Sequence, residues 1–159
     1  MKIERKYLAH YIDAAAIGSE EAVYERLGQD LEEYRAEMSA QVDTKKNILG
    51  QTSVLVSGYD KTAAVEPYYA QVGSALFERL QDIIDHNRIL DDVKTHVVEV
   101  KLWDAQDGNV FPAVKEEAYI EITAYGGDTT GYQIPFTIHY TGNKVTGTFD
   151  VTSKTFTQA

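Results

Sequence analysis

The sequence predicts a mainly β fold with a single α-helix, and three features of the chain support this prediction. From residue 94 onward, apolar and polar residues alternate in several runs, and a period of two is typical of strands with one buried face. Turn-favouring glycine and polar residues separate these runs. Residues 74–88 instead repeat their large apolar residues at helical spacing. The predicted order is therefore strands, one helix, then more strands.

Residues 19–46 allow two interpretations. Their Glu, Leu, Arg and Gln content favours a helix by propensity. From Tyr34 to Val42, however, every second residue is apolar, which is strand spacing. A glycine inside the segment would also weaken a continuous helix. We therefore predict two strands, at about 22–27 and 33–45.

A long β-hairpin is predicted to follow from the second of these strands. A polar connection containing Gly50 leads to Val54 and Val56, which again fall at strand spacing. A further strand is expected at 62–66. Together, residues 33–66 predict a long hairpin with an extended tip.

The predicted helix has a clear beginning and a clear apolar face. Ser74 is a favourable N-cap residue. The helix should end near Asn87 or Arg88, and its apolar stripe should cover one face of the sheet. That stripe consists of Leu76, Phe77, Leu80, Ile83 and Ile84.

The C-terminal region is predicted to be a series of strands joined by short turns. Asp107-Gly108 and Gly142-Asn143 have the composition of hairpin turns. Residues 126–131 contain three glycines and are expected to form a longer, flexible loop. The strands are expected at 95–103, 110–125, 134–140, 144–151 and 155–157.

The bulk composition fits one domain spanning residues 1–159. The absence of cysteine suits a reducing environment. No apolar run approaches the ~20 residues of a membrane span, and His10 and Asp13 interrupt the stretch where a signal peptide would need its apolar core. The net charge of −10 repels nucleic acid phosphates. This charge suits either solubility alone or a surface past which DNA slides without binding.

No pattern in the sequence predicts an enzyme. The four histidines have no partners at metal-ligand spacing, and phosphate-binding, dinucleotide-binding and nucleophile-elbow motifs are absent. We therefore expect no catalytic, cofactor-binding or metal site and no cofactor.

The eleven tyrosines fit either sheet packing or an interface. Pro135 predicts a sheet edge or a bulge, and a neighbouring subunit could continue such an edge.

In its succession of segments, the chain resembles the major tail proteins that form the tail tube of long-tailed phages, prophages and tailocins. The resemblance covers nearly the whole chain, although no single motif is diagnostic. The segments that carry it are 24–28 (YERLG), 33–50, 65–69 (VEPYY), 125–128 (YGGD), 134–140 (IPFTIHY) and 147–150 (GTFD).

This resemblance implies a small β-sandwich or flattened barrel, flanked by one helix and carrying a long hairpin arm. Six copies would form a ring with a continuous inner barrel, and rings would stack into a hollow tube through which DNA passes. The hairpin tip, about 43–58, would contact the next ring, and the N-terminal arm and the 126–131 loop are further contact candidates. With Pro135 added from its edge character, the predicted interface residues are Asp43, Lys45, Lys46, Asn47, Ile48, Leu49, Gly50, Gln51, Val54, Val56, Gly126, Gly127, Asp128 and Pro135.

The implied partners are further copies of the chain, a tape measure protein, tail terminator and baseplate proteins, and a sheath if the tail is contractile. DNA would pass without specific binding, and no membrane partner is expected. The implied location is the virion tail, with the host cytoplasm during assembly. Two alternatives stay open at this point: a tube component of a tailocin or secretion-type injection apparatus, and a small-ligand-binding β-barrel.

Overall fold

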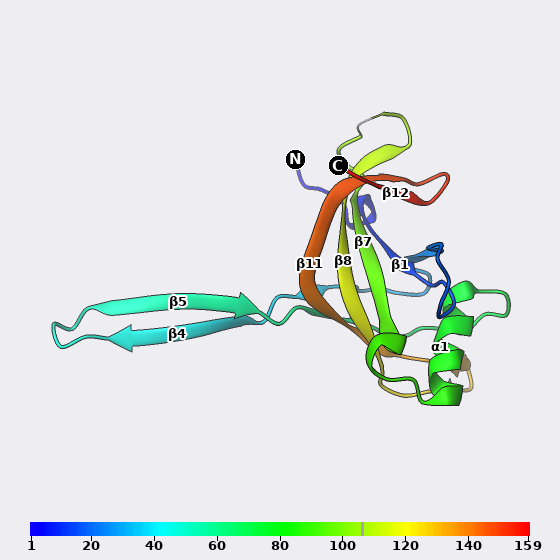
Figure 1. The fold of residues 1–159 in the computed structure, drawn as a ribbon, viewed down its shortest axis with the longest axis horizontal. Coiled ribbons are helices and arrows are strands. Elements are labelled where there is room, and N and C mark those ends of the chain that lie inside the picture. The colour runs from blue at the N-terminus through cyan, green and yellow to red at the C-terminus, as the bar shows by residue number, and fades with distance from the viewer. Residues whose placement is uncertain (106) are drawn as a thin grey trace.

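The computed structural model describes residues 1–105 and 107–159 and confirms a mainly β fold with one α-helix in those residues. Its main element is an antiparallel sheet of eight strands that curls into a half-barrel (Figure 1). The strand order is β2-β1-β7-β8-β11-β6-β3, and β12 also pairs with β11. The strands are β1 (Leu8–Asp13), β2 (Tyr24–Leu27), β3 (Ala36–Glu37), β6 (Thr62–Val65), β7 (Lys94–Lys101), β8 (Val110–Ile122), β11 (Phe136–Asp150) and β12 (Thr155–Gln158).

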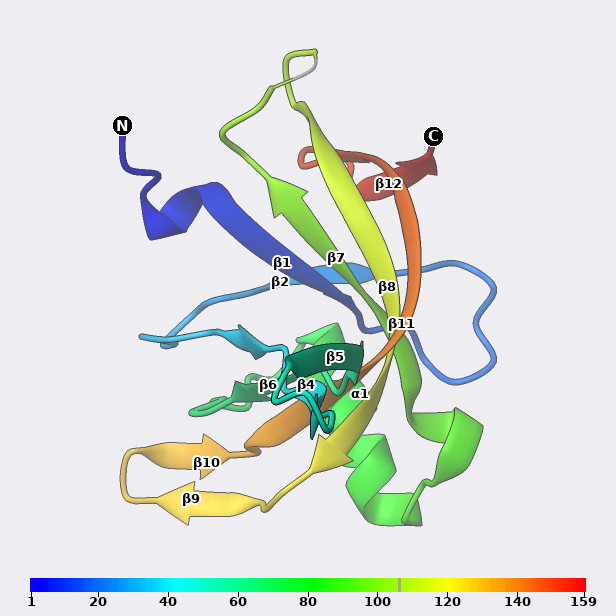
Figure 2. The same ribbon diagram turned by 90° about the vertical axis from the view of Figure 1, so that its left-hand side faces the viewer.

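Two hairpins stand apart from this sheet. The long one consists of β4 (Ala40–Lys46) and β5 (Thr52–Tyr59), and it is the predicted arm. The short one consists of β9 (Gly126–Asp128) and β10 (Gly131–Gln133). In Figure 1 the arm projects sideways from the half-barrel, and Figure 2 views the molecule with the arm pointing toward the reader.

The helix α1 (Ala75–His86) lies where the sequence predicts it. The Ser74 hydroxyl accepts a hydrogen bond from the Phe77 N–H at 3.3 Å, as an N-cap residue should. Glu25 of β2 reinforces this end, because one carboxylate oxygen accepts from Ser74 at 2.7 Å and the other from the Leu76 N–H at 3.1 Å. The Glu25 carboxylate at this N-terminus also interacts favourably with the helix dipole. At the other end, Asn87 adopts the left-handed conformation and ends the helix.

The sheet is packed on both faces, and the described residues form two apolar clusters. The larger cluster lies under α1 and includes Leu80 and Val97. The smaller cluster includes Val98 and Phe149. Val97 and Val98 belong to different clusters because successive strand side chains point to opposite faces. The double-sided packing also hides β1 from sequence reasoning, because four consecutive residues of that strand are buried and no alternation remains.

The predicted turn at Gly142-Asn143 is wrong. Both residues lie inside β11, which continues along β8 from residue 136 to residue 150. Three residues, Thr141–Asn143, face only Glu117, because Tyr140 pairs with Ala118 and Lys144 pairs with Glu116. This is a β-bulge, and Gly142 supplies the positive φ of 91° that it needs. A Gly-Asn dipeptide is compatible with both a turn and a bulge, so local composition could not distinguish these two structures.

Two smaller expectations also change. The loop predicted at 126–131 is the paired hairpin β9–β10. Helix-forming residues between 29 and 35 form no helix, and the second predicted strand is split into β3 and β4. The turn at Asp107-Gly108 is retained, since Asp107 and Val110 form a β-bridge.

Candidate functional site

The β4–β5 arm is the most distinctive surface feature of the protein. It leaves the half-barrel after β3 and returns into β6, so both of its ends are anchored at the same sheet edge. Among the described residues, these two strands pair with each other and with no other strand (Figure 1). An isolated two-stranded hairpin is marginal in water. The arm therefore depends on its anchored root, or on a partner, for its stability.

One face of the arm is apolar and exposed. Val42 pairs with Val56, and Val54 lies one pair further toward the tip on the same face. Val54 is 63% exposed, and the other two valines are also exposed. The opposite face carries the pair Asp43 and Leu55. Alternation of this kind also fits a strand with one buried face, but in the described residues this face of the arm is open to solvent.

A single side chain orders the turn at the end of the arm. Asn47 Oδ1 accepts hydrogen bonds from the N–H groups of Leu49 at 3.0 Å and Gln51 at 2.9 Å. The Asn47 amide nitrogen donates to Gln51 Oε1 at 2.8 Å, and Gly50 has a φ of 78°, which favours glycine. The turn therefore presents Ile48 and Leu49 outward in a fixed geometry. Ile48 is fully exposed and Leu49 is 76% exposed.

Buried polar contacts fix the root of the arm to the sheet. Lys61, just after β5, donates from Nζ to Glu116 Oε1 at 2.7 Å and lies 4.5 Å above the centre of the Tyr140 ring. Glu116 is 4% exposed, and its second oxygen accepts from the Gly142 N–H in the bulge at 3.2 Å. The hydroxyls of Tyr34 and Tyr140 lie 2.7 Å apart. Burial raises the pKa of Tyr34 to about 12 and also raises that of Tyr140, so both hydroxyls are protonated at neutral pH.

The structure brings most of the predicted interface residues together on the arm and places the others on the body. Asp43 through Val56 are all exposed on the arm. Gly126, Gly127 and Asp128 form strand β9, where a side chain at Gly127 would overlap the Gly131 carbonyl. The Thr130 hydroxyl and N–H both donate to the Asp128 carboxylate and lower the pKa of Asp128.

Pro135 was predicted to mark a sheet edge or a bulge, and the edge assignment is wrong. Pro135 lies just before β11, and β11 pairs with β8 on one side and β6 on the other. Its carbonyl accepts hydrogen bonds from the N–H of Thr123 at 3.1 Å and from the Thr123 hydroxyl at 3.0 Å. A proline directly ahead of a strand removes no ladder hydrogen bond, so it is compatible with a central position.

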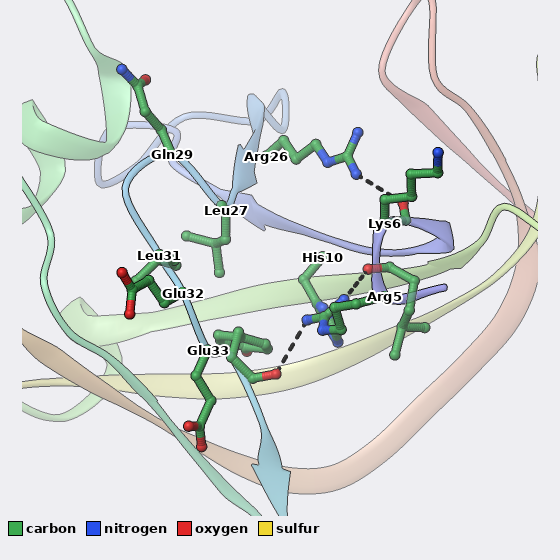
Figure 3. A pocket seen from close by; sticks show the side chains of 12 residues that line it. Arg5, Lys6, His10, Arg26, Leu27, Gln29, Leu31, Glu32 and Glu33 are labelled. Atoms are coloured by element: carbon green, nitrogen blue, oxygen red, sulfur yellow. Dashed lines mark hydrogen bonds between the residues drawn. The ribbon is translucent and has the colours of Figure 1, made fainter. Parts of the chain in front are cut away.

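Sequence reasoning missed an open cavity of about 580 Å³ beside β1 and β2 (Figure 3). Arg5 donates to the carbonyls of Leu8 and Tyr34, and Arg26 donates to the carbonyl of Lys6 at 3.4 Å. Both guanidinium groups therefore hold main-chain segments in place. The labelled residues around the cavity are Arg5, Lys6, His10, Arg26, Leu27, Gln29, Leu31, Glu32 and Glu33.

His10, on the wall of this cavity, is buried. Its Nε2 lies 3.4 Å from Glu99 Oε2, and its ring lies 4.5 Å from that of Tyr34. The hydrogen bond from His10, more than any other interaction, lowers the pKa of Glu99. These contacts link β1, β7 and the segment before β3, so they connect the cavity wall to the segment that leads into the arm.

Residues 1–105 and 107–159 contain no group of three or more His, Cys, Asp or Glu side chains placed to hold a metal ion. Within the same residues, no helix is long and apolar enough to cross a bilayer. No protein-family model matches the chain, and no curated protein matches it.

Proposed function

We propose that this chain is a structural virion protein that assembles into hexameric rings, which stack to form a hollow tail tube. The observation that carries the proposal is the arm: a preformed hairpin with an exposed valine face and an exposed aliphatic tip. Burying a large aliphatic side chain contributes about 1.5–3 kcal/mol. Covering Val42, Val54, Val56 and the tip by another copy therefore offers a large favourable term for association.

The open half-barrel supports lateral association. Within residues 1–105 and 107–159, the end strands β2 and β3 each pair on one side only, so unpaired backbone groups remain at both ends of the curled sheet. Joining such sheets from several copies would close them into one larger barrel and remove the free edges. A ring closed in this way uses a head-to-tail contact in which two different surfaces meet.

The charge of the chain fits a conduit for DNA. The net charge of −10 is repeated in every copy. Where this charge lines the bore, the wall repels phosphates over roughly 8 Å in physiological salt, so DNA moves without adhering.

The proposed role is structural and not enzymatic. The proposed partners are the chain itself, a tape measure protein and the terminator and baseplate proteins, with a sheath in a contractile tail. The proposed location is the virion tail, reached after assembly in the host cytoplasm.

Negative-stain electron microscopy of the purified full chain at high concentration tests this proposal. We expect rings or tubes, formed by the protein alone or after addition of its baseplate proteins. The double variant Val54→Asp/Val56→Asp should abolish them, because it places two charges on the apolar arm face without altering any buried residue. Val72→Asp, at a fully exposed position between β6 and α1, is the matched control and should assemble normally. A wild-type chain that stays monomeric beside its baseplate would refute the proposal.

The same geometry serves a tailocin or a secretion-type injection tube, because those tubes use the same contacts. Genomic neighbours distinguish them, since sheath genes without capsid genes indicate a tailocin.

A second, different candidate is a small-ligand-binding protein. The cavity of about 580 Å³ favours this candidate, because its volume is typical of ligand pockets. Thermal stabilisation by a member of a metabolite panel, with no assembly in the microscope, would favour that candidate.

A further inference from the structure

The body of the protein has an apolar groove at the end away from the arm. The groove lies between the C-terminal part of α1, the following 3₁₀ segment (Leu90–Val93) and the end of β8, and its volume is about 630 Å³. Figure 1 shows α1 and the arm at opposite ends of the longest axis. The residues that line this α1–β8 groove are Ile83, Ile84, Asn87, Arg88, Ile89, Leu90, Val93, Ile120, Glu121, Ile122, Thr123, Ala124 and Tyr125.

The rim of the groove is held in a conformation that exposes aliphatic side chains. Leu90 is 77% exposed and has a φ of 56°, a left-handed conformation that is unfavourable for leucine. Ile89 beside it is also exposed. Arg88 braces this segment, because it pairs with Asp82 at 3.3 Å and with Asp92 at 3.7 Å. Strained, exposed residues that the surrounding structure holds in place are typical of binding sites.

On the basis of the assembly proposed above, we propose that the α1–β8 groove receives the arm tip of a second copy, with Ile48 and Leu49 as the inserted side chains. The tip suits this role because its hydrogen bonds to Asn47 fix it before contact, and preorganisation lowers the entropy lost on binding. The tip cannot fill the groove of its own chain, because the arm projects away from the body on the side opposite α1.

Charge complementarity favours this occupant over an unrelated apolar partner. The arm, residues 40–59, contains Lys45, Lys46 and Asp43, so its net charge is +1 within a chain of net charge −10. The segment 82–92 beside the groove contains four aspartates and one arginine, a net charge of −3. The cationic end of one copy therefore meets an acidic surface on the next, which favours this orientation of docking.

Cysteine cross-linking tests the contact directly, because the native chain has no cysteine. The double variant Leu49→Cys/Leu90→Cys places one thiol on the tip and one on the groove rim of each copy. Mild oxidation should then give a ladder of covalent oligomers on a non-reducing gel. The control Leu49→Cys/Val72→Cys has its second thiol at an exposed position outside the groove and should give no ladder.

Charge variants provide a second measurement on the same surfaces. Leu49→Asp and Leu90→Asp should each raise the protein concentration needed for assembly by about 10- to 100-fold, as expected for loss of one buried leucine. Val72→Asp should leave that concentration unchanged. Both leucines are exposed in the single chain, so neither variant should change the thermal unfolding of the unassembled protein.

The outcomes separate the groove contact from the tube proposal. A ladder together with the two concentration shifts supports the contact. Rings or tubes that form with no ladder, and with both aspartate variants assembling normally, overturn the contact and leave the tube. A ladder from particles that never form rings or tubes overturns the tube and leaves the contact. A chain that gives neither overturns both.

Discussion

The buried ion pair at the root of the arm gives the sharpest test of how the structure is held together. Glu116 Oε1 lies 2.7 Å from Lys61 Nζ, and the side chains of Glu116 and Lys61 are 5% and 15% exposed. Glu116→Gln keeps an acceptor for the Gly142 N–H but leaves the lysine charge without a counter-charge. Removing one partner of a buried pair costs about 3–5 kcal/mol. Because Lys61 retains some solvent contact, we expect the lower end, about 3 kcal/mol.

That loss is large enough to measure by urea unfolding of the unassembled chain. For a chain of 159 residues, a loss of about 3 kcal/mol lowers the melting temperature by roughly 6–12 °C. The urea midpoint should fall while the m-value stays constant, because the surface exposed on unfolding is unchanged. The double variant Lys61→Met/Glu116→Gln should be more stable than Glu116→Gln alone, because it contains no unpaired charge.

The neighbouring residue provides a matched control. Glu117 pairs with Lys94 at 3.3 Å on the opposite face of the same strand, and that pair is more exposed. Glu117→Gln should cost less than about 1 kcal/mol, as surface ion pairs do. The reasoning fails if Glu116→Gln and Glu117→Gln have equal effects, or if Lys61→Met and Glu116→Gln are strictly additive.

Three further perturbations follow from individual contacts. Glu25→Ala should lower the free energy of unfolding by about 1–2 kcal/mol, because the carboxylate caps the first turn of α1 through Ser74 and the Leu76 N–H. The urea midpoint measures this loss. The control Glu21→Ala, at an exposed position, should leave the midpoint unchanged. Gly147→Ala should destabilise the fold by about 1–3 kcal/mol, since its Cβ would overlap the Thr157 carbonyl in the β11–β12 pairing. Gly58→Ala should change stability little, because its Cβ would meet only the Gln41 side chain, at an ordinary contact distance of 3.9 Å. Burial, with a smaller contribution from the Asp13 carboxylate, raises the pKa of Tyr24 to about 12, and burial also raises that of Tyr34 to about 12. The folded state therefore keeps protons that the unfolded chain loses above its ordinary tyrosine pKa of about 10. The contribution of these two tyrosines to stability should be fully present below pH 10 and be lost as the pH rises toward 12. Denaturant unfolding as a function of pH measures this fall, and a slope that Tyr24→Phe leaves unchanged would contradict the assignment.

The sequence predicts those elements whose local pattern has one explanation. The helix was predicted at about residues 74–88, because Ser74 and a regular apolar stripe both indicate it, and the structure has it at Ala75–His86. The arm was predicted because apolar residues fall at strand spacing on both sides of a polar turn, up to Val42 before it and at Val54 and Val56 after it. The alternation could not show that the apolar face is open, since the same pattern fits a strand packed on a core.

Features that depend on distant contacts were not predictable in the same way. Strand β1 lacks alternation because both of its faces are buried. The groove is formed by α1, a 3₁₀ segment and β8, so no local pattern defines it. Leu90 has a positive φ of 56°, which its residue type does not predict, because leucine rarely adopts the left-handed conformation. Gly142-Asn143 was assigned to a turn because glycine beside a polar residue is typical of turns, and the same dipeptide is also found in bulges.

The bulge in β11 limits how the length of this strand can change. It adds two residues relative to β8, so Ile138 before it and Phe149 after it keep the side-chain orientations that their separate clusters need. An insertion or deletion of one residue there would invert the second half of the strand and expose Phe149. A change of two residues would preserve that orientation. Viable length variants at this position should therefore differ by even numbers only.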